Sequence, residues 1–198
     1  VAGRSAAKLA ELKAGLGDAA RELPVILAEA HDEASLQALC AQTRVVVSTV
    51  GPYALYGSEL VKVCAESGTD YYDLTGEPQW IARMLAKHEA AAQRSGARIV
   101  HCCGFDSLPS DLGTYFLQGQ SQERFQASCS RVKLRVKAMR GTFSGGTVAS
   151  MMEMLREVGK DRSILKVLQN PYAFCGQQLK LRQPNPAPVS FDDDAKSW

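Results

Sequence analysis

The sequence predicts an α/β protein built on a doubly wound parallel sheet. Apolar, strand-like segments alternate with amphipathic, helix-like segments, and Gly or a capping residue separates most neighbours. The strand-like segments are almost continuously apolar, which is typical of parallel strands covered on both faces. A helix between successive strands is the pattern of right-handed βαβ crossovers.

Polar caps and Pro mark the expected helix starts, and Gly marks the expected ends. The starts are Ser5, Asp32, Ser58 and Pro78, and the ends are Gly17, Gly68 and Gly96. The expected helices are 5–17, 32–40, 58–68, 78–96 and 107–118. The expected strands are 24–28, 45–50, 69–74 and 99–103.

The pattern changes after this first region. Residues 131–138 alternate strictly between basic and apolar side chains, which predicts a strand with one wet face in an antiparallel or mixed sheet. The basic face is either solvated or a contact for an anionic partner. A helix is expected over 147–159, with Met151 and Met154 packing in the core. We therefore expect a partial dinucleotide-binding domain over 1–118 and part of a second, substrate or dimerisation domain over 128–198.

Composition excludes several classes of protein. The chain has 198 residues, 45% of them hydrophobic, and a net charge of +2, which gives no electrostatic case for nucleic acid as a partner. No apolar run approaches the ~20 residues that span a bilayer, and no signal peptide is recognisable. The six cysteines show no CxxC pair and no metal-type spacing, so we expect a reducing, cytoplasmic setting and no metal. Of the triplet 101–103, only His101 and Cys103 would share a strand face.

Ligands of doubly wound sheets bind at the carboxyl ends of the strands. Gly occurs at four of the five expected strand ends, which suits backbone that approaches a ligand closely. Arg4 follows the first of these Gly residues, at a position where Arg accommodates the 2′-phosphate of NADP. No GxGxxG turn occurs in the chain. We therefore expect a piece of a longer protein that lacks the first strand and its phosphate-binding turn, and that alone binds dinucleotide poorly.

Four blocks of sequence, in this order, resemble the saccharopine dehydrogenase-like oxidoreductases, a family that includes trans-acting enoyl reductases. The blocks are "AGRS", "VVVSTVGPYALYGSELVKVCAESGTDYYDLTGEPQWI", "HCCGFDSLPSDLG" and "SGGT". The resemblance implies a Rossmann-type domain, a second α/β domain with an open mixed sheet, and an NAD(P) cofactor. It places Gly3, Arg4 and Ser5 at the adenosine ribose and Asp32 near the adenine. It also places other residues beside the nicotinamide and the substrate, namely Thr49, Val50, Gly51, Pro52, Gly76, Gly104 and Phe105.

Three strand-end residues are candidates for the proton transfer that accompanies hydride transfer: Tyr53, Glu77 and Asp106. Each has a structural alternative, because Tyr53 can pack in the core while Glu77 and Asp106 can hold helix N-termini.

The expected function is an NAD(P)-dependent oxidoreductase that prefers NADP and transfers a hydride to or from a small or lipid-linked substrate. Enoyl reduction and oxidation of an amino-acid-derived C–N bond both remain open. The alternative is a non-enzymatic scaffold or lipid-surface interaction protein with a vestigial cofactor site. Peripheral membrane contact and a homodimer are compatible with either reading.

Overall fold

The computed structural model describes the whole chain except residues 137, 139, 176–188, 195 and 197–198. It confirms the α/β prediction, because all described strand pairs are parallel. Strand β1 (Ala2–Gly3) pairs with β2 (Ile26–Leu27) in one sheet. A second sheet has the order β3-β4-β5, with bounds Val45–Ser48, Asp70–Asp73 and Ile99–Val100.

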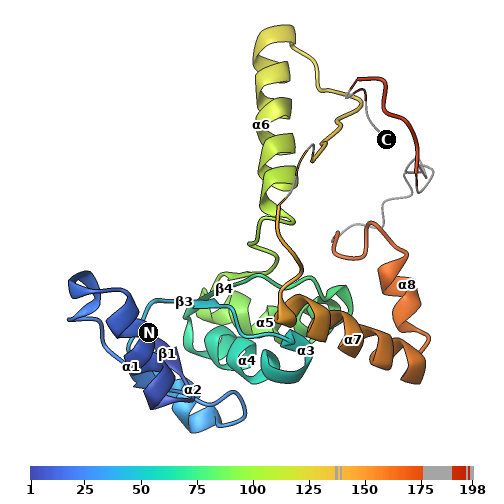
Figure 1. Cartoon of the computed structure of the whole chain (residues 1–198). Coiled ribbons are helices and arrows are strands. Elements are labelled where there is room, and N and C mark those ends of the chain that lie inside the picture. Colours follow the sequence, from blue (N-terminus) through green and yellow to red (C-terminus); the bar gives the residue numbers. More distant parts are fainter. Residues whose placement is uncertain (137, 139, 176–188, 195, 197–198) are drawn as a thin grey trace.

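The predicted helices of the first region are present (Figure 1). They are α1 (Ala6–Gly15), α2 (Glu33–Cys40), α4 (Ser58–Ser67) and α5 (Pro78–Ser95). A 3-10 turn, η1 (Asp18–Ala20), and the short helix α3 (Tyr53–Tyr56) were not predicted. Ser5 and Asp32 accept hydrogen bonds from backbone N–H groups of the first turns of α1 and α2, as N-caps do.

Two helix ends confirm the role of Gly, and one expected cap differs. Gly68 and Gly96 adopt left-handed conformations (φ 79° and 82°) directly after α4 and α5. Ser58 does not cap α4, because Gly57 stands at that position. The hydroxyl of Ser58 instead accepts a hydrogen bond of 3.0 Å from Nε1 of the buried Trp80.

The main core lies on one face of the three-stranded sheet, against α2, α4 and α5. Tyr71 is central to it, and its register partner Val46 packs there with Ile99, which lies across from Tyr71 in β5. The expectation of strands covered on both faces is wrong for these residues. The neighbouring row on the other face is accessible, with Val47 66% exposed and Val100 40% exposed. The reason is that α2, α4 and α5 all pack against the Tyr71 side of this sheet.

The region after β5 departs further from the sequence prediction. Helix α6 (Leu108–Phe125) runs past the expected end at 118 and stands away from the sheets, without a buried residue (Figure 1). Residues 131–136 are not in a strand, and Lys137 of the expected strand lies outside the described residues. Lys133 and Arg135 instead form ion pairs with Asp192 and Asp194.

Helices α7 (Gly145–Lys160) and α8 (Ile164–Leu168) follow. Helix α7 corresponds to the helix expected over 147–159 and packs beside α3 (Figure 1). Met151 is half exposed and Met154 is half-buried, so neither packs in a core as expected. No described helix has the combination of length and apolar character that crossing a membrane requires.

Candidate functional site

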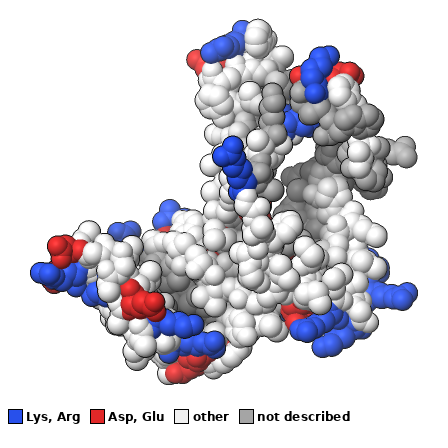
Figure 2. Space-filling model, viewed as in Figure 1, with Lys and Arg blue, Asp and Glu red and all other residues white. Residues whose placement is uncertain are grey.

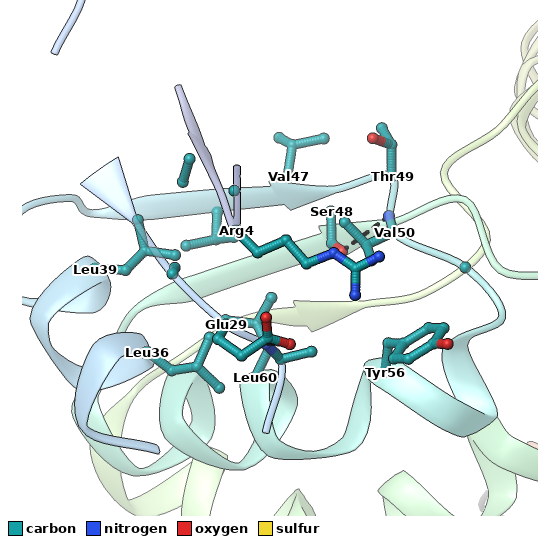
Figure 3. Close-up of a pocket in the computed structure, with 16 residues that line it drawn as sticks. Arg4, Glu29, Leu36, Leu39, Val47, Ser48, Thr49, Val50, Tyr56 and Leu60 are labelled. Atoms are coloured by element: carbon teal, nitrogen blue, oxygen red, sulfur yellow. Dashed lines mark hydrogen bonds between the residues drawn. The ribbon is translucent and has the colours of Figure 1, made fainter. Parts of the chain in front are cut away.

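A cavity of about 370 Å³ opens between the two sheets, where the carboxyl ends of β1, β2 and β3 converge (Figure 3). Its floor is apolar and is formed by α2, β3 and Leu60 of α4, whereas its mouth carries most of the polar groups. The lining residues are Ala2, Gly3, Arg4, Ala28, Glu29, Ala30, Leu36, Leu39, Val46, Val47, Ser48, Thr49, Val50, Gly51, Tyr56 and Leu60. This is the part of an open α/β sheet at which ligands bind.

Arg4 is the cation of this cavity. It follows β1 directly, and its side chain extends across the mouth, with the guanidinium near Val50 and Glu29 in the view of Figure 3. Within the part of the chain that the structure describes, Arg4 forms neither an ion pair nor a side-chain hydrogen bond. Its five N–H donors are therefore available to an anionic ligand.

Glu29 is the carboxylate of the cavity and was not predicted. It follows β2, and its Oε1 accepts a 3.1 Å hydrogen bond from the backbone N–H of Ala30. The hydroxyl of Ser35 in α2 accepts from the N–H of Glu29 (3.0 Å), which anchors this turn to the helix. The position directly after an apolar strand was the signal that could have identified Glu29.

The carboxyl end of β3 forms the opposite wall. Thr49, Val50 and Gly51 line the cavity, and the preceding Ser48 is buried. The N–H of Val50 lies 3.4 Å from Oγ of Ser48, which holds the turn close to the strand end (Figure 3). Tyr56, one turn further along, closes the cavity at this side and its ring lies 5.8 Å from that of His31.

Tyr53 and Glu77, two candidates for proton transfer, are structural partners of one another. The buried Tyr53 hydroxyl donates to the carbonyl of Ser48 (3.0 Å) and accepts from the N–H of Leu74 (3.2 Å). Burial raises the pKa of Tyr53 above its usual value. Glu77 is 1% exposed, and its carboxylate accepts from the N–H groups of Tyr53 and Ala54 and from the hydroxyl of Ser150, each at 2.8 Å. Neither residue lines the cavity.

Asp106 is the third candidate, and its carboxylate is uncommitted. It does not cap α6, because Ser107 occupies the N-cap position, and it makes no hydrogen bond with any described residue. The carboxylate lies over two glycines: a Cβ on Gly104 would be 2.6 Å from Oδ1, and one on Gly76 would be 3.8 Å from Oδ2. Phe105 is exposed beside it. This group also lies outside the cavity lining.

Five of the eleven expected cofactor residues line the cavity, and the other six lie elsewhere. Ser5 and Asp32 act as N-caps, while Pro52 is buried at the start of α3. Gly76, Gly104 and Phe105 surround Asp106 at the ends of β4 and β5. Their roles toward a cofactor stay predictions.

Charge around the site is mixed. In Figure 2, charged side chains of both signs cover the lobe formed by α1 and α2, whereas the face over β3 and β4 carries few. Among the described residues, no group of three or more His, Cys, Asp or Glu side chains is placed to hold a metal ion. Among the described lining residues, Arg4 is therefore the one cation and Glu29 the one anion that the cavity presents to a ligand.

Residues 1–100 match the family model of the saccharopine dehydrogenase NADP-binding domain. The chain belongs to this family. The resemblance inferred from the sequence is thus confirmed, and the family is one of NADP-binding domains, in agreement with the expected cofactor. No solved structure matches the chain.

Curated relatives extend the comparison beyond residue 100. A putative trans-acting enoyl reductase of Mycobacterium tuberculosis is 42% identical over 172 residues, covering 87% of this chain and 41% of the relative. The trans-acting enoyl reductase of Mycobacterium leprae is 38% identical over 175 residues, covering 88% of this chain and 42% of the relative. That of Mycobacterium bovis is 39% identical with the same coverage. This member of the family therefore spans about two fifths of the length of these relatives.

Proposed function

We propose that this chain carries the NADP-binding part of an oxidoreductase that reduces the carbon–carbon double bond of a lipid-linked enoyl substrate. The observation that supports it best is the unpaired Arg4 guanidinium at the mouth of a cavity at the carboxyl ends of β1 and β3. The proposal of enoyl reduction, in preference to oxidation of a C–N bond, rests on the relatives, which are named trans-acting enoyl reductases.

The lining residues fit the adenosine half of a dinucleotide. Gly3 lines the cavity next to Arg4, whose guanidinium provides the planar pair of donors that a 2′-phosphate accepts. Glu29 faces the same space and is suited to accept a hydrogen bond from a ribose hydroxyl. The described lining contains no Gly-rich turn that leads into a helix, which is the feature that normally holds the pyrophosphate.

Bound NADPH would supply the hydride for the reduction. In this proposal, Thr49, Val50 and Gly51 position the nicotinamide half along the β3 wall, and Val50 and Tyr56 help to exclude water. Reduction of an enoyl group also consumes one proton, and Asp106 is the candidate to hold it, because its carboxylate has no other described partner. Tyr53 and Glu77 shape the turn next to this wall and act as positioning residues.

The non-enzymatic alternative rests on the basic segment at 131–137, of which Arg131 forms no ion pair with a described residue and Lys137 lies outside the described residues. Lys133 and Arg135 pair with Asp192 and Asp194, so their charges are already neutralised within the chain. This leaves the cavity as the best-supported functional feature.

Titration calorimetry with NADPH and NADH tests the proposal on the whole polypeptide as its gene encodes it. Wild type should bind NADPH more tightly, and Arg4→Asp should weaken NADPH binding roughly 10- to 100-fold while affecting NADH little. Arg94→Asp is the matched control, since Arg94 is an exposed residue of α5 outside the cavity and the change in charge is the same. Equal affinity of wild type for both cofactors would contradict the role of Arg4, and binding of neither would contradict the oxidoreductase.

A further inference from the structure

A second cavity, of about 250 Å³, lies beside the outer strand β5 and shares no residue with the first. Helix α5 forms one side of it, and the segment that leads into and out of β5 forms the other. The lining residues are Val61, Met84, Leu85, His88, Glu89, Ala92, Gln93, Ala97, Ile99 and His101. Neither the family match nor the proposed function assigns a role to this cavity.

The inner wall of this β5 cavity is apolar. Val61, Met84 and Ala92 are buried, and Met84, His88 and Ala92 form one ridge of α5 at intervals of four residues. At the rim, the amide of Gln93 donates to the carboxylate of Glu89 at 3.3 Å, so these polar groups satisfy one another. A ligand entering the cavity therefore meets mainly hydrocarbon.

His101 is the polar group of the inner wall. Its side chain is 7% exposed, and its Nδ1 lies 2.6 Å from Oδ2 of the fully buried Asp73. Oδ1 of Asp73 accepts from the N–H groups of Thr75 and Cys102, both at 3.1 Å. The other ring nitrogen of His101, Nε2, is buried and has no hydrogen-bond partner among the described residues. A buried nitrogen without a partner is unfavourable, so it marks a position that a ligand group can satisfy.

The partner of Nδ1 decides which chemistry suits Nε2. Because a carboxylate accepts from Nδ1–H, Nε2 is an acceptor in the neutral imidazole and a donor in the imidazolium. A hydroxyl can both donate and accept, so it matches either form. His88 also lines the cavity, and burial lowers the pKa of His88, which keeps this side chain neutral near pH 7.

We propose that the β5 cavity binds a small, uncharged, apolar molecule with one hydroxyl, of the phenol or arylalkyl alcohol class, whose hydroxyl pairs with Nε2 of His101. The cavity holds the equivalent of roughly eight waters, which suits a single substituted aromatic ring. The rings of Trp80 and Tyr71, with centroids 5.1 and 5.9 Å from that of His101, shield the pair from solvent.

The test compares two isomers, p-cresol and anisole, which differ in whether the oxygen carries a hydrogen. Binding to the whole polypeptide is followed by NMR through the imidazole nitrogens of His101 and the methyl groups of Val61 and Met84. p-Cresol should shift these signals saturably, and anisole should bind roughly three- to tenfold more weakly, because it lacks the donor. In His101→Phe the difference in affinity between the two isomers should disappear. His31→Phe is the matched control, because His31 is exposed and lies outside this cavity, and it should keep the difference seen in wild type.

Three outcomes would overturn the proposal. They are equal affinity for the two isomers, saturable binding that leaves the His101 nitrogens unshifted, and no binding of p-cresol because water alone fills the cavity. If His101→Phe does not fold, the comparison of the isomers on wild type still decides the question.

Discussion

Glu77 offers the sharpest test of how this site is built, because its carboxylate has one structural and one catalytic interpretation. The change is Glu77→Gln, which keeps the size of the side chain but replaces one acceptor oxygen with an NH₂ donor. In the structure both oxygens accept: Oε1 from Tyr53 N–H and the Ser150 hydroxyl, and Oε2 from Ala54 N–H. In either orientation of the Gln amide, its NH₂ group faces a backbone N–H, that of Tyr53 or that of Ala54, so two donors oppose one another.

The expected loss of stability follows from these contacts. A hydrogen bond to a charged group contributes about 1.5–3 kcal/mol, and the buried N–H or hydroxyl that loses it is left without a partner. The negative charge that faces the N-terminus of α3 is lost as well. The Gln side chain is neutral, so the cost of burying a charge is avoided, and this offsets part of the loss of stability. We expect the free energy of unfolding to fall by about 2–4 kcal/mol, and by more in Glu77→Ala, which removes all three bonds and leaves a void.

Urea denaturation of the whole polypeptide, followed by circular dichroism, measures this loss of stability. It is seen as a lower urea concentration at the midpoint of unfolding, while the dependence of the free energy on urea concentration stays unchanged. Glu66→Gln is the matched control, since Glu66 is exposed on α4 and should change stability by less than about 0.5 kcal/mol. If Glu77→Gln is as stable as wild type and binds NADPH normally but has lost turnover, the structural interpretation of Glu77 is refuted and the catalytic one stands.

Two further predictions concern the core and the edge of the main sheet. Gly57→Ala should destabilise the protein by about 1–3 kcal/mol in the same assay, because the new Cβ would lie 2.7 Å from Cζ2 of Trp80. Its control is Gly113→Ala in α6, where the new Cβ would meet no described atom within 4 Å apart from the backbone of its own helix. A destabilised control or an unaffected Gly57→Ala would refute this prediction. Arg98 lowers the pKa of Asp70 by hydrogen bonding to its carboxylate, so wild type should be more stable than Asp70→Asn at neutral pH and lose that advantage as the pH falls through the lowered pKa. If wild type remains more stable than Asp70→Asn at a pH below that lowered pKa, the stabilising role of the Asp70–Arg98 pair is contradicted.

Local signals in the sequence predicted the elements well, because they act over a few residues. Ser5 and Asp32 bond to the N–H groups two or three positions on, and Gly68 ends α4 through its own φ angle. The hydrophobic run at 45–50 likewise predicted a strand. Whether Val47 is covered depends on helices distant in sequence, and that is where the expectation of burial was wrong.

The candidate site was predictable only where it depends on strand order. Arg4 directly follows β1 and Gly51 lies in the turn after β3, so the rule for the carboxyl ends of parallel strands pointed to both positions. The bond between Glu77 and the N–H of Tyr53 joins residues 24 apart, and no pattern in either segment indicates it. The alternation at 131–136 is a true local signal, but a strand also needs a backbone partner in register, which the alternation alone cannot specify.

Helix α7 is joined to the first region of the chain by side-chain hydrogen bonds near the candidate site. Ser150 donates to Glu77, and Glu157 accepts from Gln79 (2.9 Å) and Arg83 (2.7 Å) of α5. A Cβ on Gly51 would lie 3.5 Å from the hydroxyl of Ser150, so α7 also packs directly behind the cavity wall. The division at 118–128 stays a prediction for the polypeptide as a whole. For the cavity, however, residues 145–160 act with the first region, because they fix the carboxylate that holds the turn after Gly51. Changes on the α7 face that carries Ser150 and Glu157 should therefore alter cofactor binding, although neither residue touches the cavity.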